Sequence, residues 1–135
     1  MSQELIELVL IGHEGFNRGD LSEARANITY DVEWGTTGSW PGLDETYHGP
    51  EALDEWMKIL HSEWETFRVS LDEVVEDAGD AVVLTERLSG RGRESGIEVE
   101  MQVFSVYRSD GGKIVKRQSF RTRDEALDAL RSSEP

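Results

Sequence analysis

The chain has 135 residues, of which 28 are acidic and 14 are basic, so its formal net charge is −14. A chain of this length is expected to fold as one domain, residues 1–135, around a single core. The negative charge would repel phosphate backbones and anionic membrane surfaces, so nucleic-acid and membrane binding are not expected. A solvated surface explains this charge, with adaptation to high salt as the alternative.

The sequence contains no cysteine, which excludes disulfides, thiolate nucleophiles and sulfur-based zinc sites. No secretory leader pattern opens the chain, and no apolar run approaches the roughly 18 residues that span a bilayer. The histidines, His13, His48 and His61, do not cluster as metal ligands do. We therefore expect a cytoplasmic protein without a metal or a cofactor.

The N-terminal part predicts two helices and a strand. Residues 2–17 have apolar positions at helical spacing, followed by a short helix over residues 21–26 with Asp20 as its N-cap. Residues 29–34 alternate as a half-buried strand does, with Tyr30, Val32 and Trp34 on one side. Asp31 and Glu33 should therefore point away from the side that carries Trp34.

A loop and a third helix are predicted next. Residues 35–49 contain Trp40 and Tyr47 among glycines and polar residues, and large aromatic side chains on such a loop are expected to cover something. Pro50 can occupy the first turn of the following helix. The apolar positions of this helix share one face: Leu53, Trp56, Met57, Leu60 and Trp64.

From residue 67 onward the hydrophobic period is two, which predicts four strands over residues 67–75, 81–90, 97–108 and 113–121. Turn-forming residues at 77–80, 92–96 and 110–112 separate them, so the strands should form a meander of hairpins. Residues 123–131 predict a short amphipathic helix at the end.

The faces of these strands suggest a pocket. The expected inward positions include a polar set, and each buried polar group requires a partner: Arg87, Ser89, Ser105, Arg117 and Ser119. A β-bulge would exchange the two faces, and Arg117 would then be a surface residue. The opposite, apolar face should be covered by a second subunit in a sheet-to-sheet homodimer; its expected members are Leu84, Leu88, Phe104, Val106, Ile114 and Phe120.

Several short segments, read in order, resemble the SnoaL-like family of the nuclear-transport-factor-2-like (NTF2-like) superfamily, which is related to ketosteroid isomerase. They are residues 15–20, 31–34, 41–44, 47–49, 77–80, 90–93, 95–99, 112–115 and 123–127. The resemblance implies an α+β fold, a cone-shaped barrel in which a curved, mostly antiparallel sheet wraps three N-terminal helices and a short C-terminal helix follows. It also implies a pocket between sheet and helices, and frequently a dimer. Members include polyketide cyclases, steroid isomerases, epoxide hydrolases and dehydratases, so function does not transfer with the fold.

The resemblance leaves most catalytic positions of these relatives unfilled. In ketosteroid isomerases a carboxylate acts as the base, and the resemblance places Trp34 at that position. The position of their oxyanion tyrosine falls at or near Gly12, and that of their partner acid falls at or near Ser105. Relatives that open epoxides use two aspartates around an arginine. Arg87 matches that arginine, but Ser89 and Ser119 replace the aspartates.

SnoaL-type cyclases and the dehydratases pair a histidine with an aspartate. Of the three histidines, only His13 is expected near the pocket, and the sequence shows no carboxylate that would orient it. The catalytic candidates are therefore His13 and Arg87, with Arg87 and Arg117 offering positive charge to an enolate or carboxylate.

The expected function is binding of a small hydrophobic or polyketide- or steroid-like molecule, with a cyclase, isomerase or dehydratase reaction on a carbonyl compound. The alternative is a non-catalytic binding or dimerisation module that has lost the acid and base residues. The expected pocket residues are Gly12, Phe16, Trp34, Trp40, Trp56, Leu60, Met101, Val103, Ser89, Ser105, Arg117 and Ser119.

Overall fold

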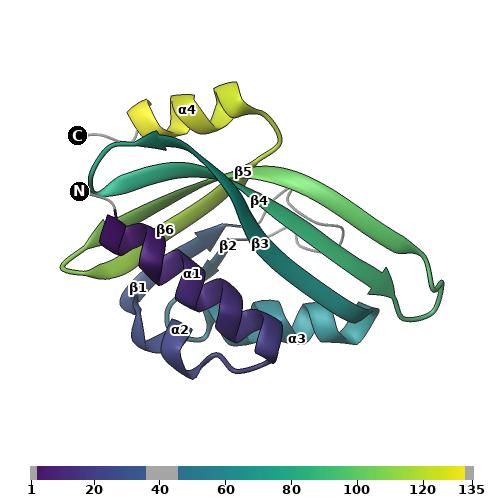
Figure 1. Ribbon diagram of the computed structural model, residues 1–135. Coiled ribbons are helices and arrows are strands. Elements are labelled where there is room, and N and C mark those ends of the chain that lie inside the picture. The colour runs from purple at the N-terminus through teal and green to yellow at the C-terminus, as the bar shows by residue number, and fades with distance from the viewer. Residues whose placement is uncertain (1–2, 36–45, 133–135) are drawn as a thin grey trace.

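The computed structural model describes residues 3–35 and 46–132, and it shows an α+β fold built on one curved sheet (Figure 1). The elements in chain order are α1 (Gln3–Arg18), α2 (Ser22–Ala26), β1 (Ile28–Gly35), β2 (Thr46–His48), α3 (Ala52–Glu63), β3 (Trp64–Asp77), β4 (Ala81–Gly92), β5 (Glu98–Asp110), β6 (Lys113–Phe120) and α4 (Arg123–Ser132). The six strands lie in the order β2-β1-β6-β5-β4-β3. Among the described strands, β1 and β6 pair in parallel and the other neighbours are antiparallel.

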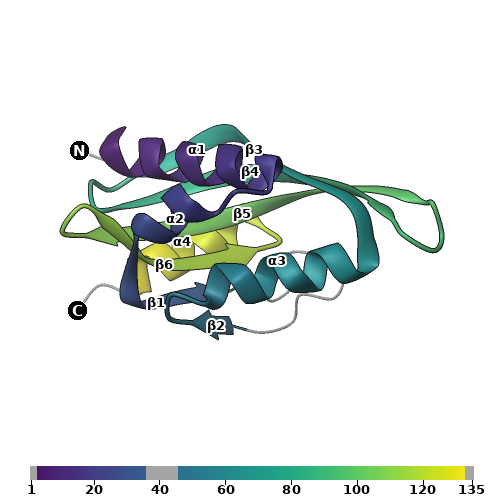
Figure 2. The ribbon, with the colours of Figure 1, turned by 90° about the horizontal axis from the view of Figure 1, so that it is seen from below.

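The helices divide between the two faces of the sheet. Figure 1 and Figure 2 show α1, α2 and α3 over one face and α4 over the other. We call the first face concave and the second convex. The main core lies between α1, α2, α3 and the concave face, and it includes Leu5, Val9, Val32, Trp56 and Leu88. A smaller cluster lies under α4 and contains Ala81, Val83, Val106, Ala126 and Leu130.

The predicted helices and strands are present, with most strands longer than expected. Two details are wrong: Trp64 begins β3 rather than ending α3, and the N-cap of α2 is Leu21 rather than Asp20. The three predicted hairpin turns are present, and two of them turn at Gly79 and Gly96, whose φ angles are 90° and 68°. Strand β2 was not predicted, because a three-residue strand is too short to show an alternating pattern. It pairs with the end of β1, where Trp34 lies opposite Tyr47. Trp40 lies outside the described residues.

Three residues expected on the apolar, dimer-forming face lie on the other side of the sheet. Leu84 and Leu88 belong to the concave side, because they lie an even number of residues from Val82 along β4 and share its side of the strand. Ile114 is also in the main core. It pairs with Ser109, and the register of β5 with β6 shifts between Arg108 and Ser109, so the simple alternation of faces is interrupted at this point.

The remaining members of the expected apolar face do lie on the convex side. Val106, Phe104 and Phe120 pack in the cluster under α4. Helix α4 therefore covers part of the surface that was expected to need a second subunit.

Tyr30 was predicted to share the buried side of β1, but it is 87% exposed. The pairing of β1 with β6 is irregular between Ile28 and Glu33, and Tyr30 falls in that interval. Asp31 is exposed as expected, and the Glu33 carboxylate lies 3.4 Å from Lys116 Nζ.

Candidate active site

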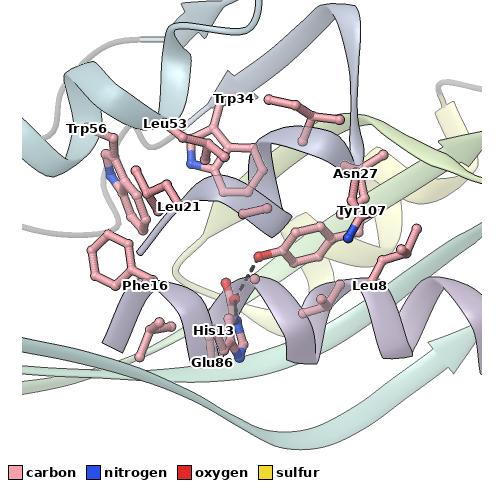
Figure 3. A pocket seen from close by; sticks show the side chains of 16 residues that line it. Leu8, His13, Phe16, Leu21, Asn27, Trp34, Leu53, Trp56, Glu86 and Tyr107 are labelled. Atoms are coloured by element: carbon pink, nitrogen blue, oxygen red, sulfur yellow. Dashed lines mark hydrogen bonds and ion pairs between the residues drawn. The ribbon is translucent and has the colours of Figure 1, made fainter. Parts of the chain in front are cut away.

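A small pocket lies between the concave face and helices α1 to α3 (Figure 3). Its free volume is about 30 Å³, room for about two water molecules, since one needs roughly 10–15 Å³. Most of its lining is apolar, including Leu8, Val9, Leu21, Ile28, Leu53, Val69 and Ile114. The polar lining residues among those described are His13, Asn27, Glu86 and Tyr107, with the indole rings of Trp34 and Trp56 beside them.

Glu86 is the centre of a buried hydrogen-bond network at this pocket. Its Oε1 accepts bonds from Ser105 Oγ at 2.5 Å and Arg117 Nη2 at 2.8 Å. Its Oε2 accepts a bond from Tyr107 OH at 2.7 Å and lies 2.5 Å from His13 Nε2. Figure 3 shows the Tyr107 hydroxyl and the His13 ring both meeting this carboxylate. Both oxygens are therefore fully engaged by the protein.

The neighbours of Glu86 keep it ionised. Burial alone would raise its pKa, but the Arg117 charge and the hydrogen bonds from His13 and Ser105 outweigh burial and hold the pKa well below its ordinary value. Residues 82, 84, 86 and 88 share one side of β4, so strand alternation itself directs this carboxylate into the core. The carboxylate is tolerated there because donors arrive from α1, β5 and β6.

Arg117 holds the positive charge of the network. Its Nη1 donates to the Gly35 carbonyl at 3.0 Å and its Nε donates to Tyr107 OH at 3.3 Å. Its guanidinium carbon lies 5.4 Å from the Trp34 ring centroid and 5.6 Å from that of Trp56, within range of cation–π attraction. The charge is thus committed to Glu86 and the aromatic rings, and the expectation that Arg117 offers it to a ligand is corrected.

Tyr107 is held in its neutral form. Burial raises the pKa of Tyr107 well above its ordinary value of 10.0, and the neighbouring Glu86 charge raises it further. Its hydroxyl donates to Glu86 and accepts from Arg117. It is a neutral bridge between the two charges.

His13 is oriented by Glu86. When the ring is neutral, a proton on Nε2 is donated to the Glu86 carboxylate at Oε2, and Nδ1 is then an acceptor. Nδ1 is buried and has no hydrogen-bond partner among the described residues. This arrangement of a histidine and a carboxylate supplies the orienting group that the sequence did not reveal.

The predicted site residues fall into three groups. Gly12, His13, Phe16, Trp34 and Trp56 line the pocket. Ser105 and Arg117 lie behind it in the Glu86 network, and the Ser119 hydroxyl is buried with no partner among the described residues. Leu60 and Val103 are core residues and Met101 packs against the core, so these three contribute packing rather than lining.

Arg87 and Ser89 do not reach the pocket. Arg87 sits on the convex face, with Nη2 at 3.0 Å from Asp72 and Nη1 at 2.8 Å from Glu100, and its side chain is 45% exposed. Ser89, two residues further along β4, shares that face and borders a surface hollow there. The reason is strand alternation: inward-facing Glu86 forces Arg87 outward.

Glu86 and the role of Tyr107 were not predicted from the sequence. A visible indication was a lone glutamate in phase with Val82, Leu84 and Leu88 in a strand. A charged residue on an apolar face implies a buried partner.

In the described part of the chain, no three histidine or carboxylate side chains are grouped to hold a metal ion. Likewise, no described helix is long and apolar enough to cross a bilayer.

The fold and the site define a pocket protein in which a curved sheet and three helices enclose a buried histidine–carboxylate pair. Residues 12–117 match the family model of the SnoaL-like domain, and the chain belongs to the SnoaL-like family. No match is found among curated proteins.

Solved structures share the fold across nearly the whole chain. TerC, co-crystallised with polyporic acid, is 22% identical with a TM-score of 0.75, covering 97% of this chain and 100% of its own. An NTF2-like protein from Burkholderia thailandensis E264 is 29% identical with a TM-score of 0.74, covering 96% of each chain. A candidate polyketide cyclase from Xanthomonas campestris pv. campestris is 19% identical with a TM-score of 0.67, covering 91% of this chain and 93% of its own.

Proposed function

We propose that this protein binds a small, mostly apolar carbonyl compound and catalyses proton transfer on it, as a cyclase, isomerase or dehydratase does. The observation that carries the proposal is the contact of 2.5 Å between His13 Nε2 and Glu86 Oε2 at an apolar pocket. A carboxylate that fixes the tautomer of a histidine and stabilises its charged form makes the ring an effective general base.

The ligand is proposed to be neutral. The Arg117 and Glu86 side chains are each only 1% exposed and they compensate one another. A charged ligand would have to be desolvated without a free counter-charge, which costs several kcal/mol. An apolar ligand with one carbonyl oxygen meets no such penalty.

The proposed step moves one proton. His13 Nδ1 accepts a proton from the carbon next to the carbonyl. The electron pair of that C–H bond forms a C=C bond to the carbonyl carbon, and the π pair of the C=O bond moves to oxygen, which gives an enolate. Glu86 stabilises the imidazolium that results, as a buried carboxylate does beside a catalytic histidine. The indole N–H groups of Trp34 and Trp56 are buried without a partner among the described residues and are candidate donors to the enolate oxygen. Return of the proton to a different atom would complete an isomerisation.

The neighbours support an organic small molecule as the ligand class. TerC was co-crystallised with polyporic acid, and the Xanthomonas protein is a candidate polyketide cyclase. At 22% and 19% identity they share the fold alone, so we propose the polyketide- or steroid-like ligand chiefly from the aromatic, apolar pocket wall.

Hydrogen–deuterium exchange at the α-carbon of 2-tetralone, followed by NMR in D₂O, tests the proposal. Wild-type protein should accelerate the exchange, and His13→Asn should reduce the acceleration at least about 100-fold. Arg87→Ala is the matched control, because Arg87 lies on the opposite face; its rate should equal that of the wild type. Equal rates for His13→Asn and the wild type would contradict the catalytic role.

The competing function is ligand binding without chemistry. Its support is the complete engagement of both Glu86 oxygens by the protein. The same experiment separates the two functions. Binding of 2-tetralone, detected by a thermal shift, with no accelerated exchange would favour the binding module.

We also propose a homodimer through the convex face. Phe104 and Phe120 pack against the cluster under α4 but stay partly exposed there. Multi-angle light scattering at micromolar concentration should give twice the mass of 15.2 kDa. A monomer mass would contradict the dimer, and Phe104→Glu should shift a dimer toward monomer by placing a charge in the interface.

A further inference from the structure

Gly12 occupies an unusual place for a glycine, in the interior of α1 and on the pocket wall. Glycine is the least favourable residue in a helix interior apart from proline. Its backbone φ is not positive, so the conformation does not require glycine. A Cβ built at this position meets no heavy atom within 4 Å, so close packing does not require it either.

Gly15, one turn later in the same helix, shows the opposite case. A Cβ there would lie 2.5 Å from the Asp20 carbonyl oxygen, and the Asp20 N–H donates to the Gly15 carbonyl at 2.8 Å. Packing of the turn after α1 therefore demands glycine at position 15. The remaining structural consequence of glycine at position 12 is open space beside His13.

We propose that Gly12 is the specificity-determining residue of the pocket, and that part of the ligand occupies the space which its missing side chain leaves next to His13. This inference rests on the proposed small-molecule function. The free pocket volume is only about 30 Å³, so one added side chain at this position removes a large share of the room for a ligand. Ring-containing ketones exceed this volume, so their binding requires the pocket walls to move apart, and a small residue at position 12 limits how far the walls must move.

The first test needs no ligand. Gly12→Ala should raise Tm by about 3 °C, because alanine favours the helix and its Cβ meets nothing. Gly15→Ala is the matched control and should lower Tm, because its Cβ meets a backbone oxygen. A Tm for Gly12→Ala below that of the wild type would overturn the inference, since packing would then require this glycine.

The second test uses cyclohexanone, 2-tetralone and anthrone, which contain one, two and three rings, with binding measured by calorimetry. Gly12→Leu should weaken binding of 2-tetralone and anthrone at least about tenfold and affect cyclohexanone least. Leu10→Phe adds bulk to the same helix at a side chain that is 47% exposed, and it should bind all three as the wild type does.

The outcomes separate the two proposals. Binding by the wild type with equal affinities in Gly12→Leu overturns the role of Gly12 and leaves the proposed function standing. No binding of any of the three ketones by the wild type counts against the proposed function, and this inference falls with it.

Discussion

The two faces of the sheet carry similar ionic groups in different surroundings. On the concave face, Arg117 and Glu86 are each 1% exposed and form one closed network with His13 and Tyr107. On the convex face, Arg87 bonds to Asp72 and Glu100, whose side chains are 28% and 60% exposed. Exposed pairs contribute little because water screens them. Burial, not residue type, determines which arginine matters for the site.

The largest expected effect comes from separating the buried charges. Arg117→Met leaves the Glu86 charge without a counter-charge, and Glu86→Gln leaves the Arg117 charge without one. Each substitution should lower the free energy of unfolding by about 3–5 kcal/mol. The double variant removes both charges and should lose about 2 kcal/mol less than the sum of the two single losses. Urea unfolding of the four proteins measures this coupling, and additive losses would contradict it.

Acid should weaken the Glu86 network, because protonation removes the negative charge that compensates Arg117. The pKa of Glu86 is lower in the folded protein than its ordinary value of 4.5, so the unfolded chain binds a proton first as pH falls. The stabilisation is complete above about pH 4.5 and should decline below it by up to about 1.4 kcal/mol per pH unit. Compared between pH 5 and pH 3, the Glu86→Gln/Arg117→Met variant should show a shallower decline than the wild type; identical slopes would contradict the assignment.

Loss of one neutral donor should have a smaller effect. Tyr107→Phe removes a hydrogen bond to an ionised buried carboxylate and should lower the free energy of unfolding by about 2 kcal/mol. The ring and its packing against Trp34 are retained. Thermal unfolding measures the change, and a loss below about 0.5 kcal/mol would indicate that water replaces the hydroxyl.

Loss of the exposed ion pairs of Arg87 on the convex face should give the smallest effect. Arg87→Ala should change the free energy of unfolding far less than Arg117→Met does, and 0.5 M salt should reduce the difference from the wild type further. Urea unfolding at two salt concentrations measures it. A loss as large as that of Arg117→Met would show that the contrast between the two faces is wrong.

The sequence predicted the elements and their order because local periodicity encodes them. It did not predict the site to the same extent, because the partners of Glu86 are far away along the chain. His13 is 73 residues from Glu86 and Arg117 is 31 residues from it. Alternation within β4 places Glu86 inward, but no local pattern shows which distant donors receive it. Arg87 was misplaced for the related reason that alternation alone does not say which side of a strand faces the helices.

The Glu86 network also bears on how the chain folds. One carboxylate joins α1, β4, β5 and β6, and Arg117 extends the connection to Gly35 at the end of β1. Such contacts form only after the sheet is assembled and the first helix has docked, because a lone carboxylate in a half-formed core is unfavourable. We therefore expect φ-values near zero for Tyr107→Phe in a chevron analysis, with the variant accelerating unfolding and leaving the folding rate unchanged. The Glu86 network and the pocket beside it would then be the last part of the molecule to become native.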